Sequence, residues 1–142
     1  MIVDGQVVWF GCDVGKMLER EMGILDPDVY DFEAVYGTSL KLDKAGCLDY
    51  GHSRMTHAMV LTSVDLDDSG KPTKWRVENS WGTEKHGDKG YMVMSDRWFD
   101  EYLYEAMVRR GYLSPELLKG LDTDPVVLPP WDPMGALAQA GW

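Results

Sequence analysis

Cysteine, long apolar runs and a secretion signal are what this sequence has least of. Only 2 of its 142 residues are cysteine, and they follow no ligand or disulfide spacing, so reduced thiols explain them better than a disulfide framework. No apolar run approaches the ~20 residues that cross a bilayer, and the first residues lack the basic and apolar regions of a signal peptide. We therefore expect a cytoplasmic protein without a membrane partner.

Basic residues are also in the minority. Lys and Arg number 14 against 24 Asp and Glu, which gives a formal net charge of −10. Neutralising nucleic-acid phosphates needs a basic surface, and so does adhesion to an anionic membrane. The acidity therefore argues against both partners, and solubility is its simplest explanation.

Close pairs of metal-ligating side chains do not occur in the sequence. The spacings Cys-x-x-Cys and His-x-x-x-His are both missing. The acidic run at 65–68 resembles the start of a calcium-binding loop, but no glutamate follows it at EF-hand spacing. We expect no metal and no other cofactor, and we interpret residues 65–72 as a solvated hairpin turn.

Aromatic residues, in contrast, are plentiful. Six tryptophans and seven tyrosines, in a chain that is 44% hydrophobic, favour an aromatic-rich core. The length suits one domain of about average size. From residue 122 the chain changes to prolines with few charges, which is typical of an extended segment. We predict one domain over residues 1–121 and an extended tail over 122–142.

The alternation of strand-like and helix-like segments predicts an α+β fold, with an antiparallel β core and peripheral helices. Expected strands are rich in β-branched and aromatic residues, and expected helices begin at Ser, Asp or Pro. Residues 38–53 are ambiguous. Strands are predicted at 2–10, 54–64, 73–81, 90–94 and 104–108, and helices at about 16–20, from 26 onward, at 96–102 and at 114–121.

His57 and Asn79 stand on two neighbouring strands of a predicted hairpin. The turn at 65–72 folds these strands back on each other, and side chains on paired strands lie about 5 Å apart. An amide oxygen can accept the ring N–H of a histidine and hold it in one tautomer, as in Cys-His-Asn catalytic triads. On the pattern alone, His57 could equally be a structural histidine bonded to a backbone carbonyl.

Several motifs, in a fixed order, resemble one family of peptidases. Residues 79–82 (Asn-Ser-Trp-Gly), followed by 87–91, resemble the asparagine segment of papain-fold peptidases. The runs 56–77, 9–16 and 131–138 narrow the resemblance to the C-terminal part of the bleomycin hydrolase family, which includes bacterial aminopeptidase C. The resemblance covers most of the chain.

This resemblance implies the β-rich half of a papain-like cysteine peptidase fold. His57 matches the catalytic base and acid of the family, Asn79 the residue that orients it, and Trp81 the indole that shields their hydrogen bond from water. The implied activity is thioester-mediated removal of N-terminal residues from peptides, and hydrolysis of aminoacyl amides. Full-length members of the family are expected to form homohexamers.

The attacking cysteine of that family has no counterpart here. It lies in a Cys-Trp segment far upstream of the histidine, and no Cys-Trp pair occurs in this sequence. Cys12 matches a cysteine without that role, and Cys47 departs from the pattern. Gln6 and Gln139 lack the context of an oxyanion-hole glutamine. We expect the chain alone to be inactive, with the cysteine on a missing N-terminal part. Two alternatives are a non-catalytic interaction or assembly module, and complementation by a separate polypeptide.

The last residues carry a second implied role. In the family, the C-terminal segment lies in the active-site cleft and holds the free α-amine of the substrate. The matching residues here are Met134, Gly135, Ala136, Leu137 and Ala138. Residues 139–142 continue past the expected end, so they are either trimmed or bend away from the cleft. His52 and Arg54 also depart from the family pattern, and nothing in the sequence explains them.

Overall fold

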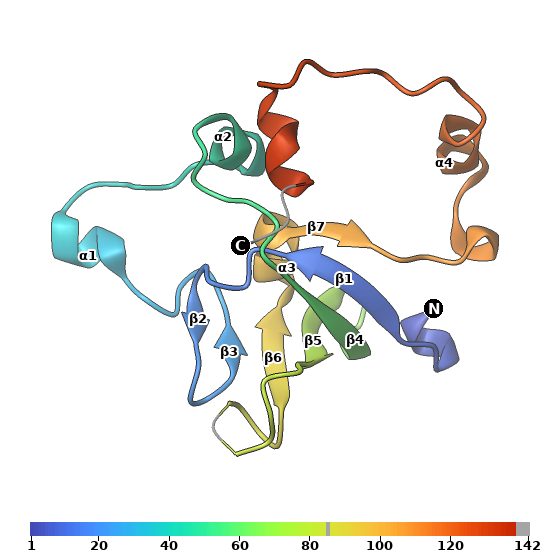
Figure 1. The fold of residues 1–142 in the computed structure, drawn as a ribbon. Helices are drawn as coiled ribbons and strands as arrows, with labels where there is room; N and C mark the ends of the chain where they lie inside the picture. Colours follow the sequence, from blue (N-terminus) through green and yellow to red (C-terminus); the bar gives the residue numbers. More distant parts are fainter. Residues whose placement is uncertain (85, 139–142) are drawn as a thin grey trace.

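One curled, seven-stranded sheet organises the chain in the computed structural model (Figure 1), which describes residues 1–84 and 86–138. The strand order across the sheet is β2-β3-β6-β5-β4-β1-β7. The strands are β1 (Val8–Cys12), β2 (Leu18–Glu19), β3 (Ile24–Leu25), β4 (His57–Leu66), β5 (Pro72–Glu78), β6 (Tyr91–Ser95) and β7 (Leu103–Ala106).

The helices are short and surround this sheet. They are the α-helices α1 (Phe32–Tyr36), α2 (Lys44–Asp49), α3 (Asp96–Tyr102) and α4 (Pro115–Gly120), and the 3₁₀ turns η1 (Ile2–Asp4), η2 (Arg110–Tyr112) and η3 (Pro133–Leu137). Neighbouring strands are antiparallel except β3 and β6, which are parallel. The predicted α+β class with an antiparallel core is therefore confirmed.

Three sequence expectations for the N-terminal half are wrong. The strand expected at 2–10 begins only at Val8, because η1 forms first and is closed by Gly5 in the left-handed region at φ 72°. The helix expected near 16–20 is instead the β2–β3 hairpin. The helix expected from residue 26 begins only at Phe32, where the Asp31 side chain accepts a hydrogen bond from the Ala34 N–H and caps it.

The core lies between the sheet and α3. Met92 and Met94 alternate inward along β6, and Val77 does so on β5. Trp98 of α3 is fully buried, and its indole N–H donates to the carbonyl of Lys16 at 2.8 Å. This bond satisfies the one polar group of the indole and ties α3 to the turn between β1 and β2.

The hairpin of β4 and β5 is the longest paired unit and follows the predicted turn. Val60 pairs with Glu78 and Leu61 with Val77, so the first residues of β4 lie beside the residues that follow β5. At the tip, Asp67 Oδ1 accepts hydrogen bonds from the N–H groups of Ser69 and Lys71 and closes the turn. The pairing shifts register twice between this tip and Val60, at Asp65/Leu66 and at Leu61/Ser63, so the pairing along both strands, and not the turn alone, brings residues 57 and 79 together.

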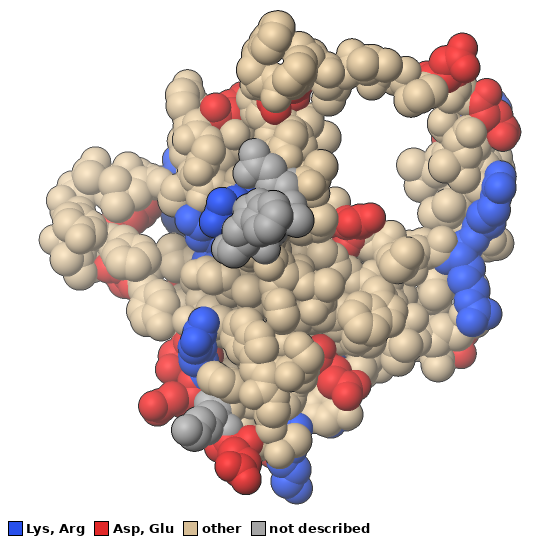
Figure 2. Space-filling view, viewed as in Figure 1, with Lys and Arg blue, Asp and Glu red and all other residues tan. Residues whose placement is uncertain are grey.

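The chain beyond α4 forms a long arm. It runs without helix or strand to η3, and Figure 1 shows it making a wide loop before it returns toward α2. In Figure 2 this arm stands away from the body of the molecule with an opening between them. Val127 and Trp131 on the arm are 90% and 83% exposed. The extended course agrees with the pattern of prolines, while the division at residue 121 stays a prediction.

Candidate active site

His57 and Asn79 are joined by a direct hydrogen bond. His57 is the first residue of β4, Asn79 follows β5, and His57 Nε2 lies 2.9 Å from Asn79 Oδ1. The same Oδ1 accepts the backbone N–H of Ser80 at 2.8 Å, which identifies it as the amide oxygen. An oxygen that faces His57 needs a donor there, so Nε2 carries the proton and Nδ1 is left with its lone pair. The pair therefore presents one imidazole nitrogen as a base.

Trp81 packs on this pair. Its ring centroid lies 5.0 Å from that of His57, with the ring planes tilted by 31°. Two other side chains hold the indole: the guanidinium carbon of Arg20 lies 4.9 Å from the Trp81 ring centroid, and the His86 ring meets it edge-on at 5.4 Å. Sequence reasoning missed Arg20 and His86, since no motif marks them and Arg20 lies on a distant segment.

An apolar cavity of about 220 Å³ opens beside His57. Gly11, Met55 and Ala58 line it together with Glu105. A Cβ at Gly11 would lie 2.3 Å from Met55 Sδ, so a larger residue there would push the Met55 side chain out of its place in the cavity wall. The cavity offers room for an uncharged group of a ligand next to the imidazole.

The two cysteines are buried free thiols and suit a structural role. Burial, helped by the charge of Asp13, raises the pKa of the Cys12 thiol to about 12. Burial, followed by the charge of Glu101, also raises the pKa of Cys47. A nucleophilic cysteine needs a lowered pKa so that the thiolate is populated. Neither thiol is prepared for attack.

The tail reaches the neighbourhood of this site. The carbonyl of Ala136 in η3 accepts a hydrogen bond from the backbone N–H of Met55 at 3.3 Å, two residues before His57. Of the other matched tail residues, Met134, Gly135 and Leu137 belong to the same 3₁₀ turn, which packs on α2, and Ala138 ends it. Residues 139–142 lie outside the described residues.

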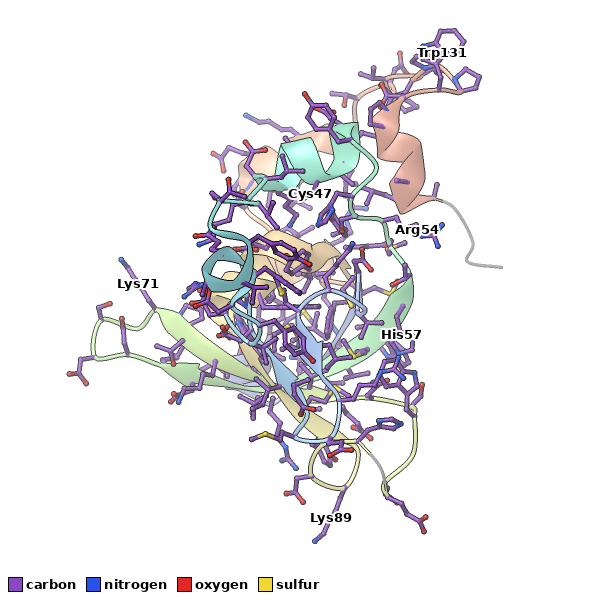
Figure 3. All side chains as sticks on the ribbon, turned by 90° about the vertical axis from the view of Figure 1, so that its left-hand side faces the viewer. Cys47, Arg54, His57, Lys71, Lys89 and Trp131 are labelled. Atoms are coloured by element: carbon purple, nitrogen blue, oxygen red, sulfur yellow. The ribbon has the colours of Figure 1, made fainter. Side chains whose placement is uncertain are left out.

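Figure 3 shows Arg54 and His57 on one edge of the molecule and Lys71, at the hairpin tip, on the opposite side.

The described residues offer neither a group of metal ligands nor a membrane-spanning helix. Among residues 1–84 and 86–138, no group of three or more His, Cys, Asp or Glu side chains could hold a metal ion. None of the helices described in those ranges is long and apolar enough to cross a membrane. His52 keeps no assigned role. It follows the end of α2, and its backbone N–H donates to the carbonyl of Cys47 inside that helix.

Comparison with known proteins decides the family. The Peptidase C1-like family matches residues 1–135. The chain belongs to this family. Within it, the chain is 58% identical over 134 residues to aminopeptidase C of Streptococcus thermophilus, covering 94% of this chain and 30% of that relative. It is 54% identical over 141 residues to bleomycin hydrolase of Homo sapiens, covering 97% and 31%.

A solved structure agrees with the sequence relatives of this Peptidase C1-like chain. The crystal structure of PepW from Lactobacillus rhamnosis superposes with a TM-score of 0.86 at 54% identity, over 95% of this chain and 30% of that one. The resemblance to the bleomycin hydrolase and aminopeptidase C family, and the papain-like α+β fold, are therefore confirmed. The chain spans about 30% of the length of the relatives it matches, as their C-terminal portion.

Proposed function

We propose that this chain forms the histidine–asparagine half of the active site of a cysteine aminopeptidase. The observation that carries the proposal is the hydrogen bond from His57 Nε2 to Asn79 Oδ1, which leaves Nδ1 as a base in one tautomer. The names of the relatives, aminopeptidase C and bleomycin hydrolase, supply the reaction class. The Trp81 indole shields the hydrogen bond from water and so strengthens it.

The proposed chemistry uses one proton shuttle twice. His57 Nδ1 takes the proton of a cysteine thiol, and the sulfur attacks the carbonyl carbon of the substrate's N-terminal residue. The imidazolium then gives its proton to the leaving amine as the C–N bond breaks, and a thioester remains. Water next loses a proton to Nδ1 and attacks the thioester, and the proton passes to sulfur as the C–S bond breaks. Asn79 Oδ1 accepts a hydrogen bond from the Nε2–H throughout, and this proton stays on Nε2.

The attacking cysteine is proposed to lie outside this chain, on the part of the relatives that precedes the matched segment. The raised pKa values of Cys12 and Cys47 support this, because neither thiol would be ionised near neutral pH. The chain alone is then inactive. The free thiols also fit a parent enzyme that works in the reducing cytosol.

The tail is proposed to set the exopeptidase preference. Its η3 turn, held to the Met55 N–H, would place residues 134–138 across the cleft beside His57 and leave room only for the substrate's free amine end. Substrates would be peptides with a free N-terminus or aminoacyl amides. A homohexamer is the proposed assembly of the complete enzyme.

The test needs the missing part of the enzyme. We would replace the C-terminal 30% of the S. thermophilus aminopeptidase C by this chain, and measure hydrolysis of a fluorogenic aminoacyl amide under reducing conditions. The chimera should turn over, and His57→Ala in it should not. The 142-residue chain alone should be silent.

Each outcome has a definite meaning. A folded chimera without turnover would refute the peptidase role and favour a non-catalytic interaction or assembly module. Turnover that survives His57→Ala would show that another group is the base. Turnover by the chain alone, lost in His57→Ala, would mean that Cys12 or Cys47 attacks after all.

A further inference from the structure

Asp13 places a carboxylate in the interior, directly after β1. The residue is only 5% exposed. Its Oδ2 accepts hydrogen bonds from Ser53 Oγ at 2.9 Å and from the Arg54 N–H at 3.2 Å. Its Oδ1 accepts one from Thr56 Oγ1 at 3.2 Å. All three donors belong to residues 53–56, the segment that leads into His57.

A buried carboxylate of this kind is costly unless its oxygens are satisfied. The ion pairs found among the described residues join Lys41 to Glu33, Lys74 to Asp65 and Arg97 to Asp28, and none includes Asp13. Three neutral donors therefore compensate its burial. A neutral residue would avoid this cost, so the carboxylate is best explained by what its three hydrogen bonds hold in place.

The segment that Asp13 holds has few other means of staying fixed. Residues 53–56 belong to no helix or strand, because α2 ends at Asp49 and β4 begins at His57. The Thr56 N–H donates to the Cys12 carbonyl and the Ser53 N–H to the Cys47 carbonyl. These backbone bonds tie the two ends of the segment, and the Asp13 carboxylate joins them through the side chains of the same two residues.

We propose that Asp13 is a positioning residue for His57. Its carboxylate fixes residues 53–56, and through them the direction in which the His57 ring leaves β4 toward Asn79. The inference rests on the proposed role of His57 as the base. It adds to that role a residue that touches no substrate and acts only through the geometry of the His57–Asn79 pair.

The first experiment compares Asp13→Ala with the conservative Asp13→Asn in the chimera described above. Alanine removes both oxygens that accept the three hydrogen bonds. We expect kcat to fall by about 100-fold, the loss expected when the His57 ring moves by roughly 1 Å, while KM stays unchanged. Asparagine keeps an acceptor for Ser53 and Arg54, so it should recover most of kcat. Asp67→Ala is the matched control, because Asp67 accepts three hydrogen bonds in the distant hairpin turn.

A second readout does not depend on turnover. The ¹⁵N spectrum of the His57 ring should show the Nε2–H tautomer in the unsubstituted chimera and a mixture of both tautomers in Asp13→Ala. A loss of kcat with an unchanged His57 spectrum would mean that Asp13 is merely structural. Unchanged kcat in Asp13→Ala would also overturn the proposal. If the unsubstituted chimera is inactive, the proposed function fails, and the spectrum alone decides the role of Asp13.

A third comparison covers the case in which Asp13→Ala does not fold. Thr56→Val removes the hydroxyl donor from the segment while Asp13 stays in place, and Thr56→Ser restores that donor. We expect kcat and the Nε2–H signal to fall in the valine variant and to return in the serine variant. Equal values in the two variants would overturn the proposal.

Discussion

Cys12 and His57 occupy paired positions on β1 and β4, but only the imidazole reaches the surface. The two residues are register partners, and Cys12 is 0% exposed while His57 is half-buried beside the cavity. The thiol belongs to the core cluster with Phe10 and Met59. Closeness to a histidine along the sheet therefore does not make Cys12 a nucleophile, because the side chain serves the interior.

The Cys12 thiol should not react with a thiol reagent in the folded chain. Its pKa of about 12, against the usual 9.0, leaves almost no thiolate at pH 8. Labelling of a Cys47→Ser variant with a chromogenic disulfide should await unfolding. Rapid labelling in native buffer would contradict the burial of Cys12.

The same pKa shift gives stability a pH dependence. The unfolded thiol loses its proton above pH 9.0 while the folded thiol keeps it to about 12, so the unfolding free energy should fall as pH rises through that window. The pKa of Tyr102 is also raised to about 12, from 10.0, and it adds a loss above pH 10.0. Cys12→Ala should reduce the slope that begins near pH 9.0, and the raised pKa of Cys47 should leave a smaller part of it. A slope that is unchanged in Cys12→Ala would assign the effect to other groups.

Asn79 should matter for turnover more than for substrate binding. Asn79→Ala removes the oxygen that accepts from His57 Nε2, so the ring can adopt the other tautomer, and kcat in the chimera should fall by about 100-fold with little change in KM. Asn79→Asp keeps an acceptor oxygen and should lose less. Steady-state kinetics of the two variants make this comparison. A larger loss in Asn79→Asp than in Asn79→Ala would argue against orientation as the role of Asn79.

Trp81 should contribute a smaller effect. Loss of an aromatic pair costs about 0.5–1.5 kcal/mol, so Trp81→Ala should lower kcat/KM by roughly 2- to 10-fold, and Trp81→Phe by less. Trp75→Ala is the matched control, since Trp75 stacks on Phe99 and its indole donates to Asp96, outside the site. It should lower the melting temperature without changing kcat/KM. Equal effects of the two alanine variants on kcat/KM would remove any special role of Trp81.

Local patterns were enough to predict the hairpin and its His57–Asn79 pair. The turn residues of 65–72 close the hairpin, and the pairing of its two strands brings the two side chains together. The helix predicted at 114–121 was found for the same reason, since Ser114 caps α4 as expected. The helix predicted at 96–102 also forms, and the structure adds its cap, Ser95. A local cap signal was not sufficient everywhere, because the helices expected at 16–20 and from residue 26 did not form there.

The rest of the site depends on contacts between distant segments. Arg20 reaches Trp81 across about 60 residues of sequence, and Asp13 reaches Ser53 across 40. Such pairs leave no periodic signal, so neither could be predicted. The β2–β3 hairpin was missed because its two-residue strands are held by the β6 edge rather than by their own propensity. Tertiary pairing decides these elements.

Gly87 should tolerate no side chain. Its φ is +60°, and a Cβ there would lie 2.1 Å from the Tyr91 carbonyl oxygen, while Gly23 packs against the same backbone. Gly87→Ala should lower the urea midpoint of the chimera well beyond Gly70→Ala. Gly70 also has a positive φ, +82°, but nothing lies within 4 Å, so only the backbone cost of roughly 1–2 kcal/mol applies there. Similar midpoints for the two variants would show that the loop carrying His86 can move aside.

Removal of the tail should turn the chimera from an exopeptidase into an enzyme that also accepts blocked N-termini. Deleting residues 133–142 removes η3 and the Ala136 carbonyl bonded to Met55, and with them the segment proposed to lie across the cleft beside His57. The measurement is kcat/KM on a free aminoacyl amide against its N-acetylated form. A weaker shift should follow Asp132→Ala, because the Asp132 side chain caps η3 by accepting from the Met134 N–H at 2.9 Å. Asp132→Asn keeps this cap and should keep the preference. A truncated chimera that still requires a free amine would place the amine-binding group elsewhere in the enzyme.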